Sequence, residues 1–319
     1  MRISWINKKG FKCSFKLAFE PLEGVFYIKL SKPCYQSVFS KNEEVLYNVG
    51  AKVSKFTVEE KPREIFAIKG IRHPSEICLS DDEKMIATFT TQGYVFIHNT
   101  ENADLVAWTK GVKEEGSGIH FLNHKNQVIF STWNGKIIFF DFLTKNFEMI
   151  VLPEVCNLYL AKTGNENNFL LFCEEVENDY GIQKVKLIDV NIKAVQELFR
   201  IGNMDIVCNF YNVANNYYFI GTQQFLASLF VYDAEKNMMR ELFSIPDEIA
   251  QTGDYEKCLC INQKETMALI GYNKLYLVDI YEQRIIKSFE ARYLSFAAFF
   301  DDDRKILIGT WEKSWTVDL

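Results

Sequence analysis

The sequence has few of the residues on which catalytic and metal sites usually depend. Only four of its 319 residues are histidine, and its eight cysteines include no Cys-x-x-Cys pair of the kind that binds zinc. The Walker loop, the dinucleotide-binding glycine fingerprint, the His-Glu-x-x-His motif and the Gly-x-Ser-x-Gly elbow are also missing. We therefore expect no catalytic residue, metal or cofactor, and predict that the protein is not an enzyme.

Long runs of one character are missing as well. No apolar run approaches the roughly 20 residues that span a bilayer, and residues 1–20 lack the apolar stretch of a secretory signal. No Lys/Arg run exceeds two residues, and 36 basic residues stand against 42 acidic ones, which gives a net charge of -6. Because sequence-independent nucleic-acid binding needs a basic surface, we predict a cytoplasmic protein with reduced thiols that binds neither nucleic acid nor membrane.

What the chain does contain is a repeat. Seven segments combine an apolar run, a short polar turn and a second apolar run, which predicts seven β-hairpins. The segments are 38–50, 78–90, 120–132, 159–173, 209–222, 259–272 and 298–311. A third apolar run follows each hairpin, and its last position recurs about every 43 residues. That position holds Val58, Asn99, Asp141, Asp189, Asp233, Asp279 and Asp318.

A fourth short apolar run closes most units, at 64–68, 105–108, 147–152, 195–199, 240–245 and 284–289. Four short strands in a unit of about 40–45 residues are typical of a β-propeller blade. No Gly/Ser-rich linker divides the chain, so we predict one all-β domain over 1–319, a seven-bladed β-propeller and a monomer. A two-sheet sandwich or several small domains are the alternatives, and neither explains seven units of nearly constant length.

The ends of the chain suggest how the ring closes. The seventh unit stops at Leu319, directly after its third strand. We predict that an N-terminal strand at 24–30 completes this last blade, which removes the open edges of an unclosed array. Residues 1–23 then form an extension that contains a further pair of strands, RISWI and FKCSFKLAF.

Several of these segments resemble the WD-repeat family of propellers in a degenerate form. The turn in LSDDEKMIATF is similar to the family's Ser-Pro-Asp-Gly-Lys turn, and Ile220-Gly221-Thr222 is similar to its second strand. The acidic residue that ends the third strand is similar to the family's Asp. The chain departs from the family in lacking the Gly-His dipeptide and the Trp before the Asp, and its second-turn Asp-Gly survives only as Asn134-Gly135. The resemblance, over about 24–319, implies the fold and names no partner.

The order of strands in a blade places the candidate binding residues on one face. In an up-and-down blade the second-to-third turns and the links between blades share a face. Aromatic anchors beside acidic loops at the mouth of a ring suit protein recognition, although such residues also cap blades. The predicted partner-binding residues are the aromatics Trp133, Tyr272 and Trp311 and, from an expanded fourth-unit loop, Glu174, Glu175, Asp179 and Tyr180. The long link from 246 to 255 lies beside this loop.

The opposite face gathers acidic residues from neighbouring units. They are Asp301, Asp302 and Asp303 of the seventh unit, Glu43 and Glu44 of the first, and Asp81, Asp82 and Glu83 of the second. A basic partner could bind this acidic arc, or its members could simply be good turn residues. We expect the cysteines on first strands (Cys78, Cys208, Cys258, Cys260) to pack near the axis.

These patterns favour a non-enzymatic, protein-binding or scaffold propeller. The first alternative is a lactonase-like or quinoprotein-like enzyme that acts on a small molecule in the central funnel. A polar funnel favours that alternative, whereas a narrow funnel lined by Cys, Ala and Phe opposes it. The second alternative is an immunity-type protein that inhibits one partner.

Overall fold

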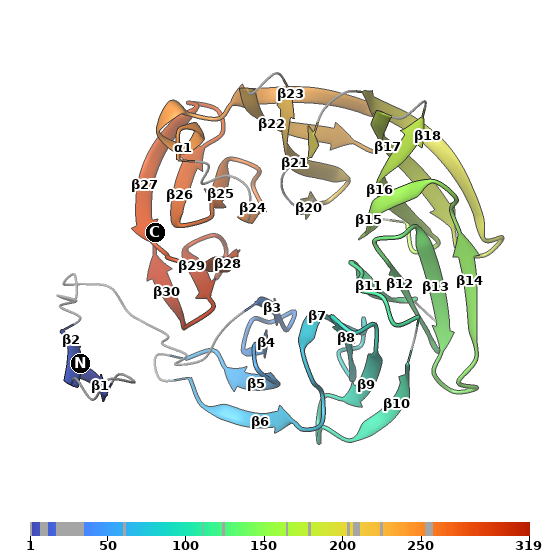
Figure 1. Cartoon of the computed structure of the whole chain (residues 1–319), viewed down its shortest axis with the longest axis horizontal. Helices are drawn as coiled ribbons and strands as arrows, with labels where there is room; N and C mark the ends of the chain where they lie inside the picture. Colours follow the sequence, from blue (N-terminus) through green and yellow to red (C-terminus); the bar gives the residue numbers. More distant parts are fainter. Residues whose placement is uncertain are drawn as a thin grey trace.

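Seven antiparallel sheets surround a central axis in the computed structural model of the chain (Figure 1). The structure describes residues 2–6, 12–16, 35–59, 62–110, 112–122, 125–163, 165–177, 180–202, 205–206, 211–223, 226–252 and 258–319. The predicted seven-bladed β-propeller is confirmed. Successive strands of a blade lie progressively farther from the axis, and we letter them A to D in that order.

The first four blades each contain four strands. Blade one comprises β3 (Gln36–Phe39), β4 (Val45–Val49), β5 (Val53–Thr57) and β6 (Glu64–Ile68). Blade two comprises β7 (Pro74–Leu79), β8 (Met85–Thr90), β9 (Val95–Asn99) and β10 (Leu105–Thr109). Blade three comprises β11 (Ile119–Leu122), β12 (Gln127–Ser131), β13 (Lys136–Asp141) and β14 (Phe147–Val151). Blade four comprises β15 (Val155–Lys162), β16 (Asn168–Glu177), β17 (Tyr180–Asp189) and β18 (Ala194–Gly202).

Blades five and seven depart from this pattern. Blade five comprises β19 (Asp205–Ile206), β20 (Tyr211–Val213), β21 (Asn216–Gln223), β22 (Leu226–Asp233) and β23 (Met238–Ser244), and both β19 and β20 pair with β21. Blade six comprises β24 (Cys258–Ile261), β25 (Met267–Gly271), β26 (Lys274–Asp279) and β27 (Arg284–Glu290). Blade seven comprises β28 (Leu294–Phe300), β29 (Lys305–Thr310) and β30 (Ser314–Asp318). The strand predicted at 24–30 to complete it lies outside the described residues.

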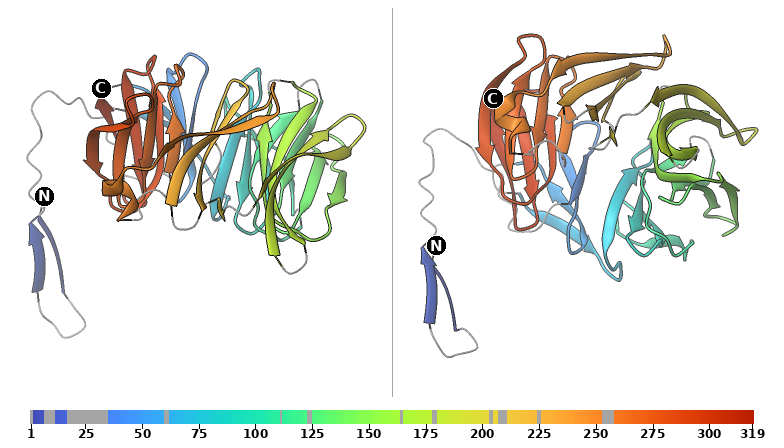
Figure 2. Two further views of the ribbon diagram at one scale, coloured as in Figure 1. Left: turned by 90° about the horizontal axis from the view of Figure 1, so that it is seen from above. Right: turned by 45° about the horizontal axis from the view of Figure 1, so that its top comes forward.

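Two elements lie apart from the blades. The short helix α1 (Asp247–Ala250) occupies the link after blade five, which the sequence predicted as a long loop. Among the described residues no helix is long and apolar enough to cross a membrane. At the N-terminus β1 (Arg2–Ile6) pairs with β2 (Lys12–Lys16), as predicted, and Figures 1 and 2 show this hairpin outside the ring.

The middle strands are apolar throughout because each blade is covered on both faces. In β12, Phe130 packs toward blade two, where its ring centroid lies 5.2 Å from that of Phe89. The preceding residue, Ile129, points to the other face of the sheet and packs with Leu158 and Leu160 of blade four. The strands of a sheet that is buried on both faces have a continuous run of apolar residues, instead of an alternation of apolar and polar residues. This explains why the B and C strands were the clearest signal in the sequence.

The ring closes through contacts between blade seven and blade one. Phe300 of β28 stacks on Phe39 of β3 with ring centroids 5.0 Å apart. Behind this pair, Phe300 and Leu307 form a buried cluster with Leu46 and Phe56 of blade one. Among the described residues no strand of blade seven pairs with a strand of blade one, and this side-chain packing joins the two blades.

The recurring acidic residue at the end of the C strand has a local role. Side-chain oxygens of Asn99, Asp141, Asp189, Asp233 and Asp279 each accept hydrogen bonds from the backbone N–H groups two and three residues onward. In blade six, Asp279 Oδ1 lies 3.0 Å from Tyr281 N and 2.9 Å from Glu282 N. Asp and Asn favour such turns because the side chain replaces a backbone acceptor. The recurring Asp or Asn therefore shapes the turn between the C and D strands.

Replacing Asp279 tests this role. We expect Asp279→Ala to lower the free energy of unfolding by about 1 kcal/mol, because two turn amides lose their acceptor. Asp279→Asn keeps an oxygen acceptor and should cost less than half as much. Urea unfolding followed by tryptophan fluorescence measures both variants, and equal losses for the two would contradict the role of the oxygen.

Candidate functional site

The two faces of the ring carry different loops. The B–C turns and the blade-to-blade links lie on one face, which we call the link face. The A–B and C–D turns lie on the other, which we call the hairpin face. The three predicted aromatics occupy B–C turns of blades three, six and seven, and their exposed fractions are 48% for Trp133, 39% for Tyr272 and 58% for Trp311.

Trp311 belongs to a group of exposed rings at the junction of blades seven and one. Tyr293 stacks on it with centroids 6.1 Å apart and planes inclined by 21°, and Tyr35 meets it edge-on at 6.5 Å. The Arg292 guanidinium lies over the Tyr293 ring, 4.8 Å from its centroid. We call Tyr35, Tyr293 and Trp311 the aromatic cluster. Mutual stacking holds these rings in place while leaving them open to solvent.

Sequence reasoning missed two members of the aromatic cluster. Tyr35 directly precedes β3 and Tyr293 directly precedes β28, so both occupy the last position of a link before an A strand. An alignment of the first and seventh units at this position would have shown a Tyr in both. Tyr272 is tied to the same region, since its backbone oxygen accepts a hydrogen bond from Leu294 N at 3.1 Å. Trp133 lies on blade three, with blades one and two between it and Trp311.

The predicted acidic loop of blade four is a pair of long strands. Glu174 and Glu175 lie within β16, which continues to Glu177, and β17 begins at Tyr180. That prediction of a loop was wrong, because β16 and β17 continue their pairing to Glu177 and Tyr180. Asp179 and the side chain of Tyr180 lie outside the described residues. Glu174 accepts a hydrogen bond from Asn157 Nδ2 at 2.9 Å.

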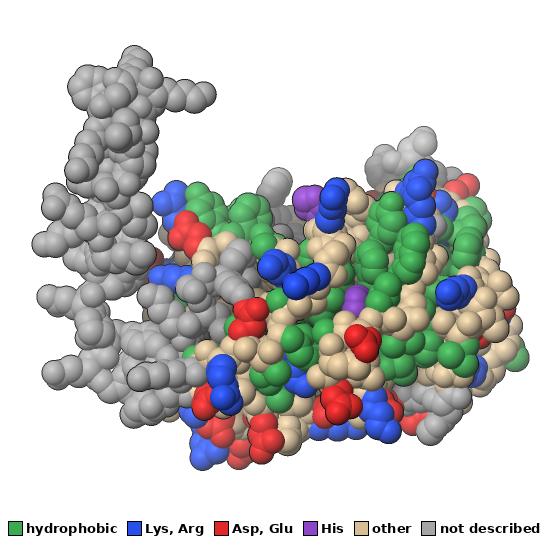
Figure 3. Space-filling view, turned by 90° about the horizontal axis from the view of Figure 1, so that it is seen from below, with side chains coloured by type: hydrophobic (Ala, Val, Ile, Leu, Met, Phe, Trp, Pro, Cys, Tyr) green, Lys and Arg blue, Asp and Glu red, His purple; other side chains and the backbone are tan. Residues whose placement is uncertain are grey.

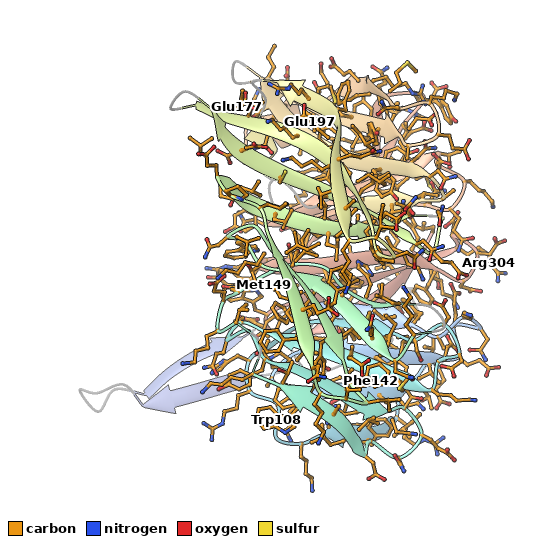
Figure 4. The ribbon with its side chains drawn as sticks, turned by 90° about the vertical axis from the view of Figure 1, so that its right-hand side faces the viewer. Trp108, Phe142, Met149, Glu177, Glu197 and Arg304 are labelled. Carbon is orange, nitrogen blue, oxygen red and sulfur yellow. The ribbon has the colours of Figure 1, made fainter. Side chains whose placement is uncertain are left out.

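The carboxylates of this hairpin are paired with cations. The Lys184 side chain is only 2% exposed, and its Nζ lies 3.0 Å from Glu175, 3.3 Å from Glu197 and in hydrogen-bond contact with Glu177. Glu175 also binds Lys186 at 2.6 Å. Figure 4 shows Glu177 and Glu197 at one end of blade four, on the strands β16 and β18 that flank β17. This end of the blade is an ion-pair network.

Electrostatics in the network favour the charged forms. Hydrogen bonds from Lys186 and then Lys184 lower the pKa of Glu175, and the hydrogen bond from Lys184 lowers the pKa of Glu177. Burial lowers the pKa of Lys184, but the surrounding glutamates outweigh it and leave that pKa above its ordinary value. Paired charges of this kind present little free negative charge to a partner.

On the hairpin face, three acidic residues of the acidic arc join neighbouring blades. Each occupies the same position of its A–B turn with φ near 60°, and its carboxylate accepts a backbone hydrogen bond from the A–B turn of the preceding blade. The bonds join Glu43 to Asp301 N at 2.6 Å, Glu83 to Lys41 N at 2.5 Å and Asp303 to Gln263 N at 3.1 Å. A buried Asn262 Nδ2 also donates to Asp303, at 3.1 Å.

Most other members of the acidic arc are also engaged. Asp81 pairs with Lys162 at 3.1 Å, Asp82 accepts from the Ser80 hydroxyl at 2.7 Å, Glu44 accepts from Asn42 at 2.7 Å and Asp301 pairs with Lys305 at 3.0 Å. These contacts lie within turns or between blades. They support the interpretation of the arc as turn chemistry and inter-blade contacts rather than as a docking surface.

The central channel contains a cavity of about 400 Å³ bordered by the A strands of blades one to four. Burial raises the pKa of Glu76 to about 7, although Glu76 Oε2 accepts a hydrogen bond from Gly118 N at 2.7 Å. Burial also lowers the pKa of His120 to about 4 and raises that of Cys78 to about 12. The lining is therefore partly polar, with a neutral imidazole and a protonated thiol at neutral pH.

The cysteines of the A strands take packing positions where the structure describes them. Cys258 and Cys260 of β24 are buried, and burial raises the pKa of Cys260 to about 12. Cys78 of β7 faces the channel cavity, whereas Cys208 lies outside the described residues. No group of three His, Cys, Asp or Glu side chains suited to a metal ion occurs in the described part of the chain.

Comparison with known proteins bears on the fold alone. No protein-family model and no curated protein sequence matches the chain. Among solved structures, hydrazine synthase of Kuenenia stuttgartiensis is similar with a TM-score of 0.71 and 9% identity, covering 94% of this chain and 99% of that one. U3-55K is similar with a TM-score of 0.64 and 9% identity, covering 92% and 98%. These TM-scores establish a shared fold over nearly the whole chain, whereas identities of 9% assign no family.

Proposed function

We propose that this chain is a non-enzymatic propeller that binds a protein partner on its link face. The observation that carries the proposal is the aromatic cluster of Tyr35, Tyr293 and Trp311, with Arg292 against it. Tyr, Trp and Arg dominate the binding energy of protein interfaces. Because these rings are already held by one another, a partner would immobilise them at little entropic cost.

A second candidate function is small-molecule chemistry in the central channel. It is favoured by the Glu76 carboxyl, whose pKa of about 7 allows it to exchange a proton near neutral pH. The neighbouring groups support it less, since the His120 ring lies 3.3 Å from Leu160 O and the Cys78 thiol stays protonated. The channel is therefore the alternative site, with Glu76 as its proposed acid or base.

Quantitative affinity capture from the native host distinguishes the two sites. We expect Trp311→Ala to reduce the recovery of at least one specific protein by about tenfold or more, as for an aromatic hot spot. Tyr281→Ala is the matched control, because Tyr281 is 73% exposed but lies in the C–D turn of blade six, on the hairpin face. Glu76→Gln tests the channel, because it removes the titratable carboxyl group and keeps the shape of the cavity.

Loss of the captured protein with Trp311→Ala alone would support the proposed function. Equal recovery with native protein and Trp311→Ala would contradict it. Loss of a ligand or activity with Glu76→Gln, while Trp311→Ala has no effect, would favour the channel instead.

A further inference from the structure

The link face of blades one and two carries a concentration of unpaired positive charge. Its turns and links contain five exposed cationic side chains, which we call the basic sector. They are Lys52, Lys69, Arg72, Lys110 and Lys113. None forms a salt bridge or side-chain hydrogen bond within the described part of the chain, whereas lysines elsewhere pair with carboxylates, as Lys193 does with Glu148 and Lys274 with Glu290.

Backbone contacts join the loops of the basic sector into one surface. Thr91 N, in the B–C turn of blade two, donates to His73 O at 3.0 Å, at the end of the link that carries Lys69 and Arg72. The same turn fits against the next link at Gly93, where a Cβ would lie 2.6 Å from Glu114 N and 3.0 Å from Lys113 N. The turn therefore bridges the two basic links without a gap.

Exposed aromatic side chains flank the basic sector at both ends. Tyr35 of the aromatic cluster donates its backbone N–H to Val49 O at 2.6 Å, beside the turn that carries Lys52. At the other end, Trp133 N donates to Glu115 O at 3.2 Å, two residues beyond Lys113. The surface is thus an arc that runs from aromatic rings through five cations to a further aromatic ring.

Negative charge is scarce along this arc although the whole chain carries a net charge of -6. Glu114 is held by Lys136 in an ion pair, and Glu115 is half-buried. Figure 3 shows this part of the rim with Lys, Arg and a His at one edge, and with most of the Asp and Glu side chains, together with further Lys and Arg side chains, at the opposite edge. Acidic side chains on this part of the rim are therefore concentrated away from the basic sector.

We propose that this arc binds an acidic peptide segment of the protein partner, with an apolar residue near each end of the segment. The inference rests on the proposed function, since it assigns the chemistry of the partner. Unpaired cations attract carboxylates and steer their approach, while the flanking rings supply apolar anchoring.

A single-stranded nucleic acid fits the arc less well. Such ligands bind where aromatic rings alternate with basic groups, so that successive bases stack. Here the exposed rings of the turns lie at the two ends, and the exposed Trp108 belongs to the outer strand β10. The links that carry Lys69, Arg72, Lys110 and Lys113 contribute no exposed aromatic side chain among their described residues. An arc with aromatic rings at its ends and cations between them matches an extended acidic peptide with apolar ends.

Fluorescence anisotropy with the full chain tests the inference. The probe is a labelled twelve-residue peptide rich in Asp and Glu with a Leu or Trp near each end, and the comparison probe replaces every Asp and Glu by Asn and Gln. We expect the acidic peptide to bind at least tenfold tighter, and Arg72→Glu to weaken it by about fivefold to tenfold. Lys145→Glu is the matched control, because Lys145 is an exposed lysine on the hairpin face.

The binding measurements either support or contradict the proposed acidic-peptide site. Salt-sensitive binding of the acidic peptide that Arg72→Glu weakens and Lys145→Glu does not would support it. Tighter binding of a labelled single-stranded DNA of similar length would overturn it in favour of a nucleic acid. No preference for the acidic probe would also overturn it, and capture that still depends on Trp311 would then leave the proposed function standing.

Discussion

The Lys184→Met variant is expected to lose about 3 kcal/mol of its free energy of unfolding at pH 7. In the native protein the buried Lys184 Nζ contacts three glutamates on strands β16 and β18. Methionine fills the same volume but leaves those carboxylates close together without their shared cation. Removing one partner of a buried ion pair is costly because the remaining charge has lost both solvent and counterion.

The loss should depend on pH in a defined direction. The folded-state pKa values of Glu175 and Glu177 are lowered, so their ionisation stabilises the native protein above the unfolded pKa of about 4.3. This contribution disappears as the pH falls through the lowered folded values. The native protein and Lys184→Met should therefore differ most between about pH 6 and 9, and converge as the pH falls below about 4.3 and through the lowered folded-state values, where the glutamates of the native protein become protonated.

Lys186→Met provides the control for this prediction. Among the described residues Lys186 pairs with Glu175 alone, at 2.6 Å, and Glu175 keeps Lys184 in that variant. We expect a loss of about 1 kcal/mol or less. Urea unfolding at several pH values, followed by circular dichroism, measures all three proteins. A Lys184→Met loss that is independent of pH would show that packing, and not charge, is what the lysine contributes.

Phe300→Ala is expected to cost about 3–4 kcal/mol, because it removes a buried ring from the junction that closes the propeller. Phe300 is 3% exposed, and it packs on Phe39, Leu46 and Phe56 of the first blade. No described strand pairing spans this junction. The remaining described links are contacts such as the hydrogen bond from Asp301 N to Glu43.

The blades in which amide exchange becomes faster distinguish this junction from the others. Hydrogen exchange of Phe300→Ala should show faster amide exchange in blades seven and one. Phe142→Ala is the control, because Phe142 is similarly buried and packs edge-on against Phe121 of its own blade (Figure 4). Its faster exchange should concentrate in blades two and three. If both variants change the same blades, packing at the junction does not govern closure.

Sequence reasoning predicted the blades well because their strongest signal is local. Each of the segments that hold β12, β25 and β29 combines an apolar strand with a polar turn, and burial between two neighbouring blades requires that composition. The Asp at the end of the C strand was also visible, since it acts on amides two and three residues away. Interactions at such short range leave a pattern that recurs with the repeat.

The candidate site was predicted only in part for the opposite reason. Trp311 was identified at the end of a B strand, but its neighbours Tyr35 and Tyr293 were not. Tyr35 lies at the other end of the sequence and reaches Trp311 only because the ring closes. Glu174 and Glu175 were identified as acidic but assigned to a loop, because composition does not show that β16 and β17 continue to pair beyond the usual strand length.

The sequence by itself determined the all-β class, the seven units, the order of strands and the faces on which the loops lie. These follow from hydrophobic patterning and turn chemistry, which act over a few residues. Tertiary structure alone decided which charges are free. It pairs Glu43 with Asp301 N and buries Lys184 among glutamates, while it leaves Lys69 and Arg72 exposed and without a salt bridge to any described residue. Pairing depends on distances between side chains on separate strands and blades, and no local pattern encodes those distances.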